Sequence, residues 1–186
     1  MSKKKTTYIN LFAGIDAKSV TALMQAVQQK LQQGTERFVL LISSPGGQVA
    51  PGLSAYNFLK GIPAEVDTHN YGSIDSVAIA VFCAGKRRLC VPNARFMLHG
   101  VGFNVPQGAR FEEKQLDERM KSLRVDRQNI ARVIAENCNK PVEAIDRDML
   151  EVKVLSPSEA QTYGLVHEIQ VELYPKGADI LLIGTS

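Results

Sequence analysis

The sequence contains few of the residues on which metal and disulfide chemistry depend, with three cysteines and three histidines among 186 residues. Cys83, Cys90 and Cys138 are odd in number and do not have the spacing of metal ligands. Cys83 and Cys90 lie in apolar segments, where a free cysteine behaves as a small hydrophobic residue. We therefore expect no metal, no cofactor and no disulfide framework, and a reducing, cytoplasmic compartment.

The sequence also lacks a long hydrophobic run. The longest one, at residues 77–84, is far shorter than the roughly 20 residues that a membrane-spanning helix requires. Lysines open the sequence, as they do in signal peptides, but the apolar stretch that follows is interrupted by Asn10 and Asp16. We expect neither an export signal nor a membrane partner.

The charge balance is close to neutral, since 22 basic residues face 19 acidic ones and the formal net charge is +3. No run of lysine or arginine is interleaved with aromatic residues, as a nucleic-acid-binding surface requires. We therefore exclude a nucleic-acid partner. The apolar content of 45% and the chain length suit one core, so residues 1–186 are predicted to form a single domain.

Strand and helix patterns alternate in the first half of the chain. Residues 38–42 form a continuous β-favouring apolar run, which is typical of a buried strand in a parallel sheet. Apolar side chains at Val20, Leu23 and Val27 have helical spacing. The predicted elements are strands at residues 8–12, 38–42 and 64–68, and helices at residues 19–33 and about 53–61. Strand, glycine-bearing turn and helix is the resulting pattern.

The second half contains one ambiguous segment and one long helix. Periodicity alone leaves residues 77–84 open between strand and helix, although Ala78 and Ala80 favour a buried helix. Residues 109–137 are highly charged with apolar side chains at helical spacing, and we expect this helix to project from the body. The remaining predictions are strands at residues 89–91, 95–98 and 166–173, a loop at 100–108, and short helices beginning at Pro141 and after Ser156.

Three local motifs carry polar chemistry. A Pro-Gly-Gly turn at residues 45–47 follows a strand, Ser76 opens an apolar segment after a glycine-bearing stretch, and His99 follows another strand. Each motif alone has an ordinary explanation, namely a tight turn, a helix N-cap and a hydrogen-bonded structural histidine. The other histidines that can act as bases are His69 and His167.

Taken together, these motifs resemble the proteolytic subunit of the Clp protease in their order and spacing. The matching segments are Ser44-Pro45-Gly46-Gly47-Gln48-Val49, Gly72-Ser73-Ile74-Asp75-Ser76-Val77-Ala78, Pro92-Asn93-Ala94-Arg95 with Met97 and His99, and Tyr163-Gly164-Leu165-Val166. The resemblance covers about residues 8–170. It implies the ClpP/crotonase-like α/β fold of repeated ββα units, with a projecting handle at about residues 100–137 and a divergent C-terminal tail at about 171–186.

The resemblance also implies a serine endopeptidase that cleaves peptides or unfolded polypeptides through an acyl-enzyme. Ser76 takes the position of the nucleophile and His99 that of the general base, which accepts the proton of the serine. The backbone N–H groups of Gly47 and Val77 take the positions of the oxyanion hole. A glycine there lets the backbone approach the substrate closely.

The third member of the triad departs from the family pattern. Counting back from the Leu-Ser pair at residues 155–156 places the family's aspartate on Val152, and a valine cannot orient an imidazole. Glu151 is our preferred substitute and Asp148 the alternative, although both also suit a solvated surface.

The residue before the nucleophile departs as well. Family members usually have small uncharged residues there, whereas Ile74 and Asp75 precede Ser76 in this chain. We expect Asp75 either to repel acidic substrates or to face solvent.

The resemblance further implies a homo-oligomer, in which heptameric rings, stacked in pairs through the handle, enclose the active sites. Peptides or unfolded proteins are the expected substrates. About seven residues precede Tyr8, fewer than the pore hairpin with which family members contact an ATPase ring. We therefore regard a Clp-type ATPase partner as weakly supported.

Two other functions are compatible with the sequence. The missing aspartate and the presence of Asp75 suit a catalytically weak ring subunit with a structural or regulatory role. A crotonase-type acyl-CoA enzyme shares the fold and also uses paired backbone N–H groups, but it has no need of Ser76 and His99 at triad spacing.

Overall fold

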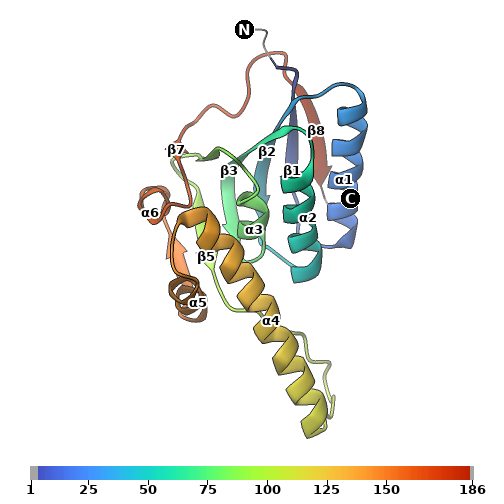
Figure 1. Cartoon of the computed structure of the whole chain (residues 1–186), viewed down its shortest axis with the longest axis vertical. Helices are drawn as coiled ribbons and strands as arrows, with labels where there is room; N and C mark the ends of the chain where they lie inside the picture. The colour runs from blue at the N-terminus through green and yellow to red at the C-terminus, as the bar shows by residue number, and fades with distance from the viewer. Residues whose placement is uncertain (1–3, 185–186) are drawn as a thin grey trace.

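The computed structural model describes residues 4–184, so residues 1–3 and 185–186 of the predicted domain and tail lie outside it. Strands and helices alternate along most of the described chain (Figure 1). The strands are β1 (Thr6–Phe12), β2 (Arg37–Ser44), β3 (Glu65–Asp75), β4 (Arg88–Cys90), β5 (Arg95–Leu98), β6 (Lys153–Leu155), β7 (Glu168–Ile169) and β8 (Asp179–Gly184). The helices are α1 (Ala17–Gln32), α2 (Val49–Gly61), α3 (Ala78–Phe82), α4 (Glu113–Cys138), α5 (Val142–Leu150) and α6 (Pro157–Tyr163).

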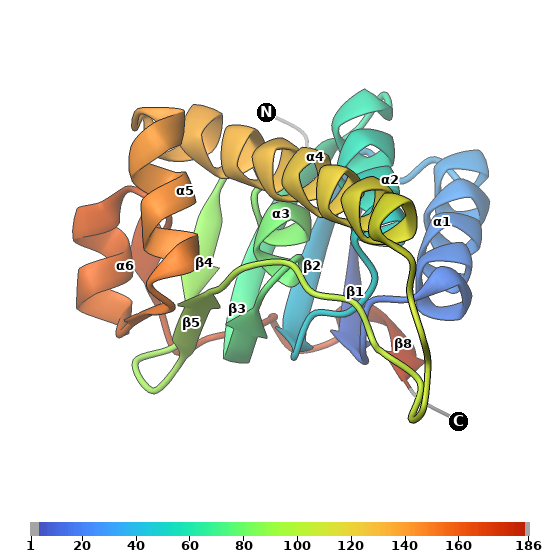
Figure 2. The same ribbon diagram turned by 90° about the horizontal axis from the view of Figure 1, so that it is seen from below.

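The strands form one sheet with the order β6-β5-β3-β2-β1-β8, and β4 joins β3 to β7. The pairs are parallel except for β5 and β6, which run antiparallel. Figure 2 shows α1, α2, α3 and α4 on one side of the sheet. Almost fully buried apolar side chains of β1 and β2 include Ile9, Leu11, Phe38, Leu40 and Ile42. The α/β class and the buried strand predicted at residues 38–42 are therefore confirmed.

Strand β3 is longer than the sequence predicts, because it continues through the glycine-bearing stretch before Ser76 to Asp75. Its first half pairs with β4 and its second half with β5, so neighbours on the same side hold its whole length. The register between β2 and β3 shifts after Ile42. A Cβ atom at Gly72 would lie 2.6 Å from the Ser43 hydroxyl, so a side chain there would displace that hydroxyl from the Ser73 N–H. The extension of β3 to Asp75 places Ser76 directly after the carboxyl end of this interior strand.

The C-terminal segment differs most from the prediction. The strand expected at residues 166–173 is reduced to β7, and the apolar stretch at 180–183 forms β8, parallel to β1. The Asp179 carboxylate fixes the start of β8 by accepting hydrogen bonds from Thr7 Oγ1, at 2.9 Å, and from Lys30 Nζ, at 2.7 and 2.8 Å. These partners are far away in the sequence, which is why local patterns did not reveal β8.

Helix α4 projects from the body, as the sequence predicts (Figure 1). Its C-terminal turns carry Ile130, Ala131, Ile134 and Ala135, which are buried against the core. Its N-terminal turns are exposed along most of their length, and Glu112 and Gln115 form a capping box at their start. Residues 99–112, which lead into α4, form neither helix nor strand. None of the helices within residues 4–184 is long and apolar enough to cross a membrane.

Candidate active site

Ser76 lies at the sharp turn between β3 and α3 and has a positive φ of 59°. A non-glycine residue rarely adopts this conformation, and such strain is common where a turn must expose a nucleophile. The Ser76 N–H donates a hydrogen bond to the Met97 carbonyl at 2.8 Å, which joins the turn to the end of β5. The hydroxyl forms no hydrogen bond within residues 4–184, so it is free to react.

Asp75 does not face solvent, so that sequence-based expectation is wrong. Its side chain is only 7% exposed. One carboxylate oxygen accepts a hydrogen bond from Ser73 Oγ, and the other accepts one from Arg95 Nη2, each at 2.8 Å. The Asp75–Arg95 ion pair therefore ties the end of β3 to the start of β5, directly before the nucleophile.

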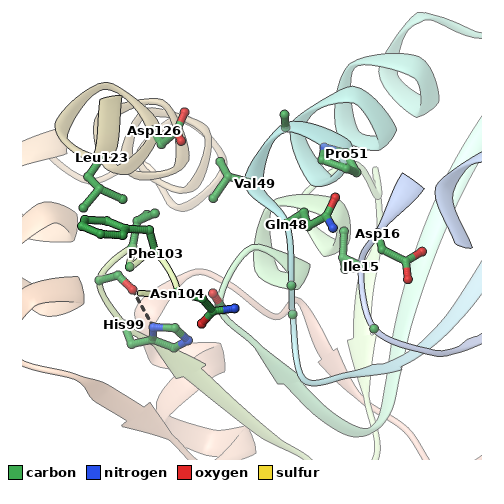
Figure 3. Close-up of a pocket in the computed structure, with 18 of the residues that line it drawn as sticks. Ile15, Asp16, Gln48, Val49, Pro51, His99, Phe103, Asn104, Leu123 and Asp126 are labelled. Atoms are coloured by element: carbon green, nitrogen blue, oxygen red, sulfur yellow. Dashed lines mark hydrogen bonds between the residues drawn. The ribbon is translucent and has the colours of Figure 1, made fainter. Parts of the chain in front are cut away.

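His99 follows β5 and lines the same cleft as Ser76, which has a volume of about 940 Å³. Its Nδ1 atom lies 2.6 Å from the Gly100 carbonyl oxygen (Figure 3). Since a carbonyl only accepts, Nδ1 must carry the proton, and the Nε2 of the neutral ring then has the free lone pair of a base. No hydrogen bond joins His99 to Ser76 in the described part of the chain.

The Gly46-Gly47 turn forms the facing side of the cleft. The Ile15 N–H donates to the Gly46 carbonyl at 2.8 Å, and the Gln48 N–H donates to the Ile15 carbonyl at 2.7 Å. In this parallel bridge Gly47 turns its own N–H away from Ile15. Within residues 4–184, neither the Gly47 nor the Val77 N–H donates a hydrogen bond. Two free donors thus accompany the serine, as an oxyanion hole requires.

The structure joins neither predicted carboxylate to His99. Asp148 accepts hydrogen bonds from Lys153 Nζ at 2.8 Å and from the Tyr163 hydroxyl at 2.6 Å. Burial raises the pKa of Asp148, but these two hydrogen bonds outweigh it and keep that pKa below its usual value. Glu151 is exposed at the C-cap of α5; its N–H donates to the Arg147 carbonyl at 2.9 Å, but its carboxylate has no hydrogen-bond partner among the described residues.

Val152 lies beside the end of the strand pair that leads to His99. Leu98 and Lys153 form the last pair of the antiparallel β5–β6 ladder; His99 directly follows the one and Val152 directly precedes the other. Val152 has a φ of 56°, which is unfavourable for a β-branched residue, and it is 53% exposed. The position at which the resemblance places the family's aspartate therefore has an unfavourable backbone conformation and an apolar side chain.

The sequence profile of the Clp protease family matches residues 4–172. The chain belongs to the Clp protease family. One relative is the ATP-dependent Clp protease proteolytic subunit of Helianthus annuus, which is 32% identical over 147 residues; the match covers 76% of this chain and 72% of the relative. Another is the ATP-dependent Clp protease proteolytic subunit of Lotus japonicus, which is 31% identical over 151 residues; that match covers 78% of this chain and 74% of the relative. A point mutant of ClpP1 from Listeria monocytogenes superimposes with a TM-score of 0.77 at 25% identity, covering 90% of this chain and 92% of that one.

Membership in the Clp protease family makes the chain a serine-type peptidase of the proteolytic-subunit kind. The acyl-CoA enzyme and the inactive ring subunit are not favoured by these matches. Cysteine chemistry does not compete with Ser76, because all three thiols are buried. Burial raises the pKa of Cys83, and it raises the pKa of Cys90 and of Cys138 to about 11, so these thiols stay protonated.

The handle also contributes to the cleft of this Clp protease, which the sequence analysis missed. Arg119, Leu123 and Asp126 line it from α4, together with Phe103 and Asn104 from the preceding loop (Figure 3). The three helical residues have the spacing i, i+4 and i+7, which puts them on one face. The spacing can be read from the sequence, but the sequence does not show which face of α4 lines the cleft.

A substitution at Gly47 tests how tightly the turn is packed. A Cβ atom there would lie 2.2 Å from the Ile15 carbonyl oxygen, so Gly47→Ala must displace the backbone and its N–H. We expect Tm to fall by several degrees and kcat to fall about tenfold, because the donor moves rather than disappears. The control is Gly61→Ala, where nothing lies within 4 Å. Equal Tm and kcat values for both variants would contradict a tightly packed turn.

Proposed function

We propose that this chain hydrolyses peptide bonds with Ser76 as the nucleophile and His99 as the general base. Ser76 Oγ attacks the scissile carbonyl while its proton passes to His99 Nε2, and the N–H groups of Gly47 and Val77 bind the oxyanion. The proton then passes to the leaving amine, and water repeats the steps to release the acyl group. The free hydroxyl at a φ of 59°, in one cleft with a base of fixed tautomer, carries this proposal.

The Gly100 carbonyl takes over part of the role of a triad carboxylate in this mechanism. It holds the proton on His99 Nδ1. The other ring nitrogen, Nε2, then carries the lone pair that accepts the serine proton. A neutral carbonyl stabilises the imidazolium less than a carboxylate does, so we expect slow turnover. Labelling of Ser76 by a fluorophosphonate, which reacts with activated serines, tests the mechanism.

Glu151 remains our candidate for a third member that acts after a movement of the α5–β6 turn. Its exposed carboxylate has no hydrogen bond in the described chain and can turn, whereas the Asp148 carboxylate is bound by Lys153 and Tyr163. We expect Glu151→Gln to lower kcat several-fold and Asp148→Asn to leave kcat nearly unchanged. Steady-state hydrolysis of a fluorogenic peptide measures both. Equal and negligible effects would leave the Gly100 carbonyl as the sole group that orients His99.

Assembly is the second part of the proposal. Membership in the Clp protease family implies an oligomeric chamber that receives peptide substrates. We propose a homo-oligomeric ring, heptameric and stacked in pairs as the family resemblance implies, with α4 in the contact. Leu116, Met120 and Val125 support this role, because they are large, apolar and exposed on the projecting helix. Sedimentation of the intact chain, compared with a Met120→Glu variant, tests it.

The proposal also covers the cellular compartment and the dependence on an ATPase partner. Three free, buried cysteines suit a reducing compartment, and we propose the cytoplasm. The relatives carry "ATP-dependent" in their names. For this chain we propose cleavage of short peptides without ATP, which the fluorogenic assay in the absence of nucleotide tests directly.

A further inference from the structure

Asp126 is a carboxylate in the active-site cleft that the mechanism does not use. It lies on α4, partly buried, and lines the cleft that also contains Ser76 and His99. No hydrogen bond or ion pair within residues 4–184 involves its side chain. The carboxylate is therefore free to pair with a cationic group of a ligand bound in the cleft.

The other charged side chains that line the cleft, Asp16 and Arg119, do not pair with Asp126. Asp16 caps α1 by accepting a hydrogen bond from the Ser19 N–H at 2.7 Å. The Arg119 guanidinium lies over two rings, 5.1 Å from the centroid of Phe103 and 4.8 Å from that of Phe111. This stacking holds Arg119 two turns away from Asp126 along the helix, toward its free end.

Arg127, the basic neighbour of Asp126 in the sequence, does not neutralise it either. Its guanidinium Nε donates a hydrogen bond to Asp146 at 2.6 Å, which ties α4 to α5. Arg124 is exposed and does not line the cleft. The negative charge of Asp126 is therefore available to a bound substrate.

The surroundings of Asp126 suit a long side chain with a charged end. Val49, Phe103 and Leu123 are arranged around the same opening as Asp126 (Figure 3). Val49 follows the proposed oxyanion-binding Gly47 by only two residues, so this opening begins beside the position of the scissile carbonyl. A substrate residue that places its carbonyl at Gly47 would direct its side chain along Val49 toward α4.

We infer that the cleft selects an arginine or lysine as the substrate residue that supplies the scissile carbonyl. The methylene groups of that side chain would pack on Val49, Phe103 and Leu123, and its cation would pair with the Asp126 carboxylate. An apolar side chain of similar length would fill the same walls but bury the carboxylate unpaired. This inference rests on the proposed peptidase function and names the substrate class of the same site.

The test compares three fluorogenic peptides that differ only at the residue before the scissile bond: arginine, its neutral isostere citrulline, and norleucine. We expect kcat/KM for arginine to exceed that for citrulline about tenfold, since one charge-assisted hydrogen bond is worth roughly that factor. Asp126→Asn should lower the arginine-to-citrulline ratio to near one. The matched control is Asp117→Asn, which removes an exposed charge of α4 outside the cleft and should leave the ratio unchanged.

A ratio near one in the unmodified protein overturns the inference, and so does a high ratio that persists in Asp126→Asn. In both cases norleucine and citrulline peptides are still cleaved, and the proposed peptidase function stands. If none of the three peptides is cleaved and a fluorophosphonate does not label the folded protein, the proposed function itself fails. Because the Asp126 side chain makes no hydrogen bond within residues 4–184, its substitution should leave Tm unchanged.

Discussion

Ser76→Ala should abolish peptide hydrolysis, lowering kcat at least about 1,000-fold, and should abolish labelling by a fluorophosphonate. The hydroxyl is the only group that this substitution removes, and loss of the nucleophile in a serine peptidase costs that much or more. The variant should fold normally, because the hydroxyl makes no hydrogen bond within residues 4–184. Mass spectrometry of the labelled protein and the fluorogenic assay measure the two effects.

Ser122 provides the matched control, because it also lines the cleft but lies on α4, away from the strained turn. Ser122→Ala should retain labelling and most of the activity. Persistent labelling of Ser76→Ala would move the nucleophile to another residue. A folded, oligomeric protein that reacts with no fluorophosphonate at all would refute the peptidase mechanism.

Val152→Asp is expected to raise kcat about 100-fold. Residue 152 directly precedes, and His99 directly follows, the last pair of the β5–β6 ladder, so we expect a carboxylate there to accept the hydrogen bond of the Nδ1 N–H in place of the Gly100 carbonyl. Removing the orienting carboxylate costs about 10⁴ in a well-studied serine protease, and restoring it here should recover part of that factor. Aspartate also tolerates the φ of 56° better than valine, so Tm should rise slightly.

Val152→Asn separates the two effects. Asparagine relieves the backbone strain equally well but carries no charge to stabilise an imidazolium. We expect it to raise Tm as much as Val152→Asp does, with little gain in kcat. Equal rates for Val152→Asp, Val152→Asn and the unmodified chain would show that residue 152 does not reach His99.

The parts of the fold that depend on local pattern were predictable. The buried run at residues 38–42 and the helical spacing of Val20, Leu23 and Val27 became β2 and α1. The long charged helix became α4, which starts four residues later than expected, at Glu113 instead of residue 109. The pattern that predicts each of these elements lies within a few neighbouring residues of the sequence.

The parts that depend on distant partners were not predictable. Strand β8 is held by Thr7 and Lys30, and the second half of β3 by β5. The same applies to Asp75, whose environment depends on Arg95, 20 residues later. A single sequence does not show these pairings, so a charge next to the nucleophile looked exposed when it is buried in an ion pair.

The pairing of β1 with β8 bears on the order in which the chain can fold as it is synthesised. Strand β1 is made before the other described strands, yet one of its two neighbours is complete only at Gly184. The hydrogen bond from Thr7 to Asp179 spans 172 residues, and contacts this distant form slowly because a large loop must close first. Until then one edge of β1 is open to strands of other nascent chains, so newly made protein should depend on chaperones more than its size suggests.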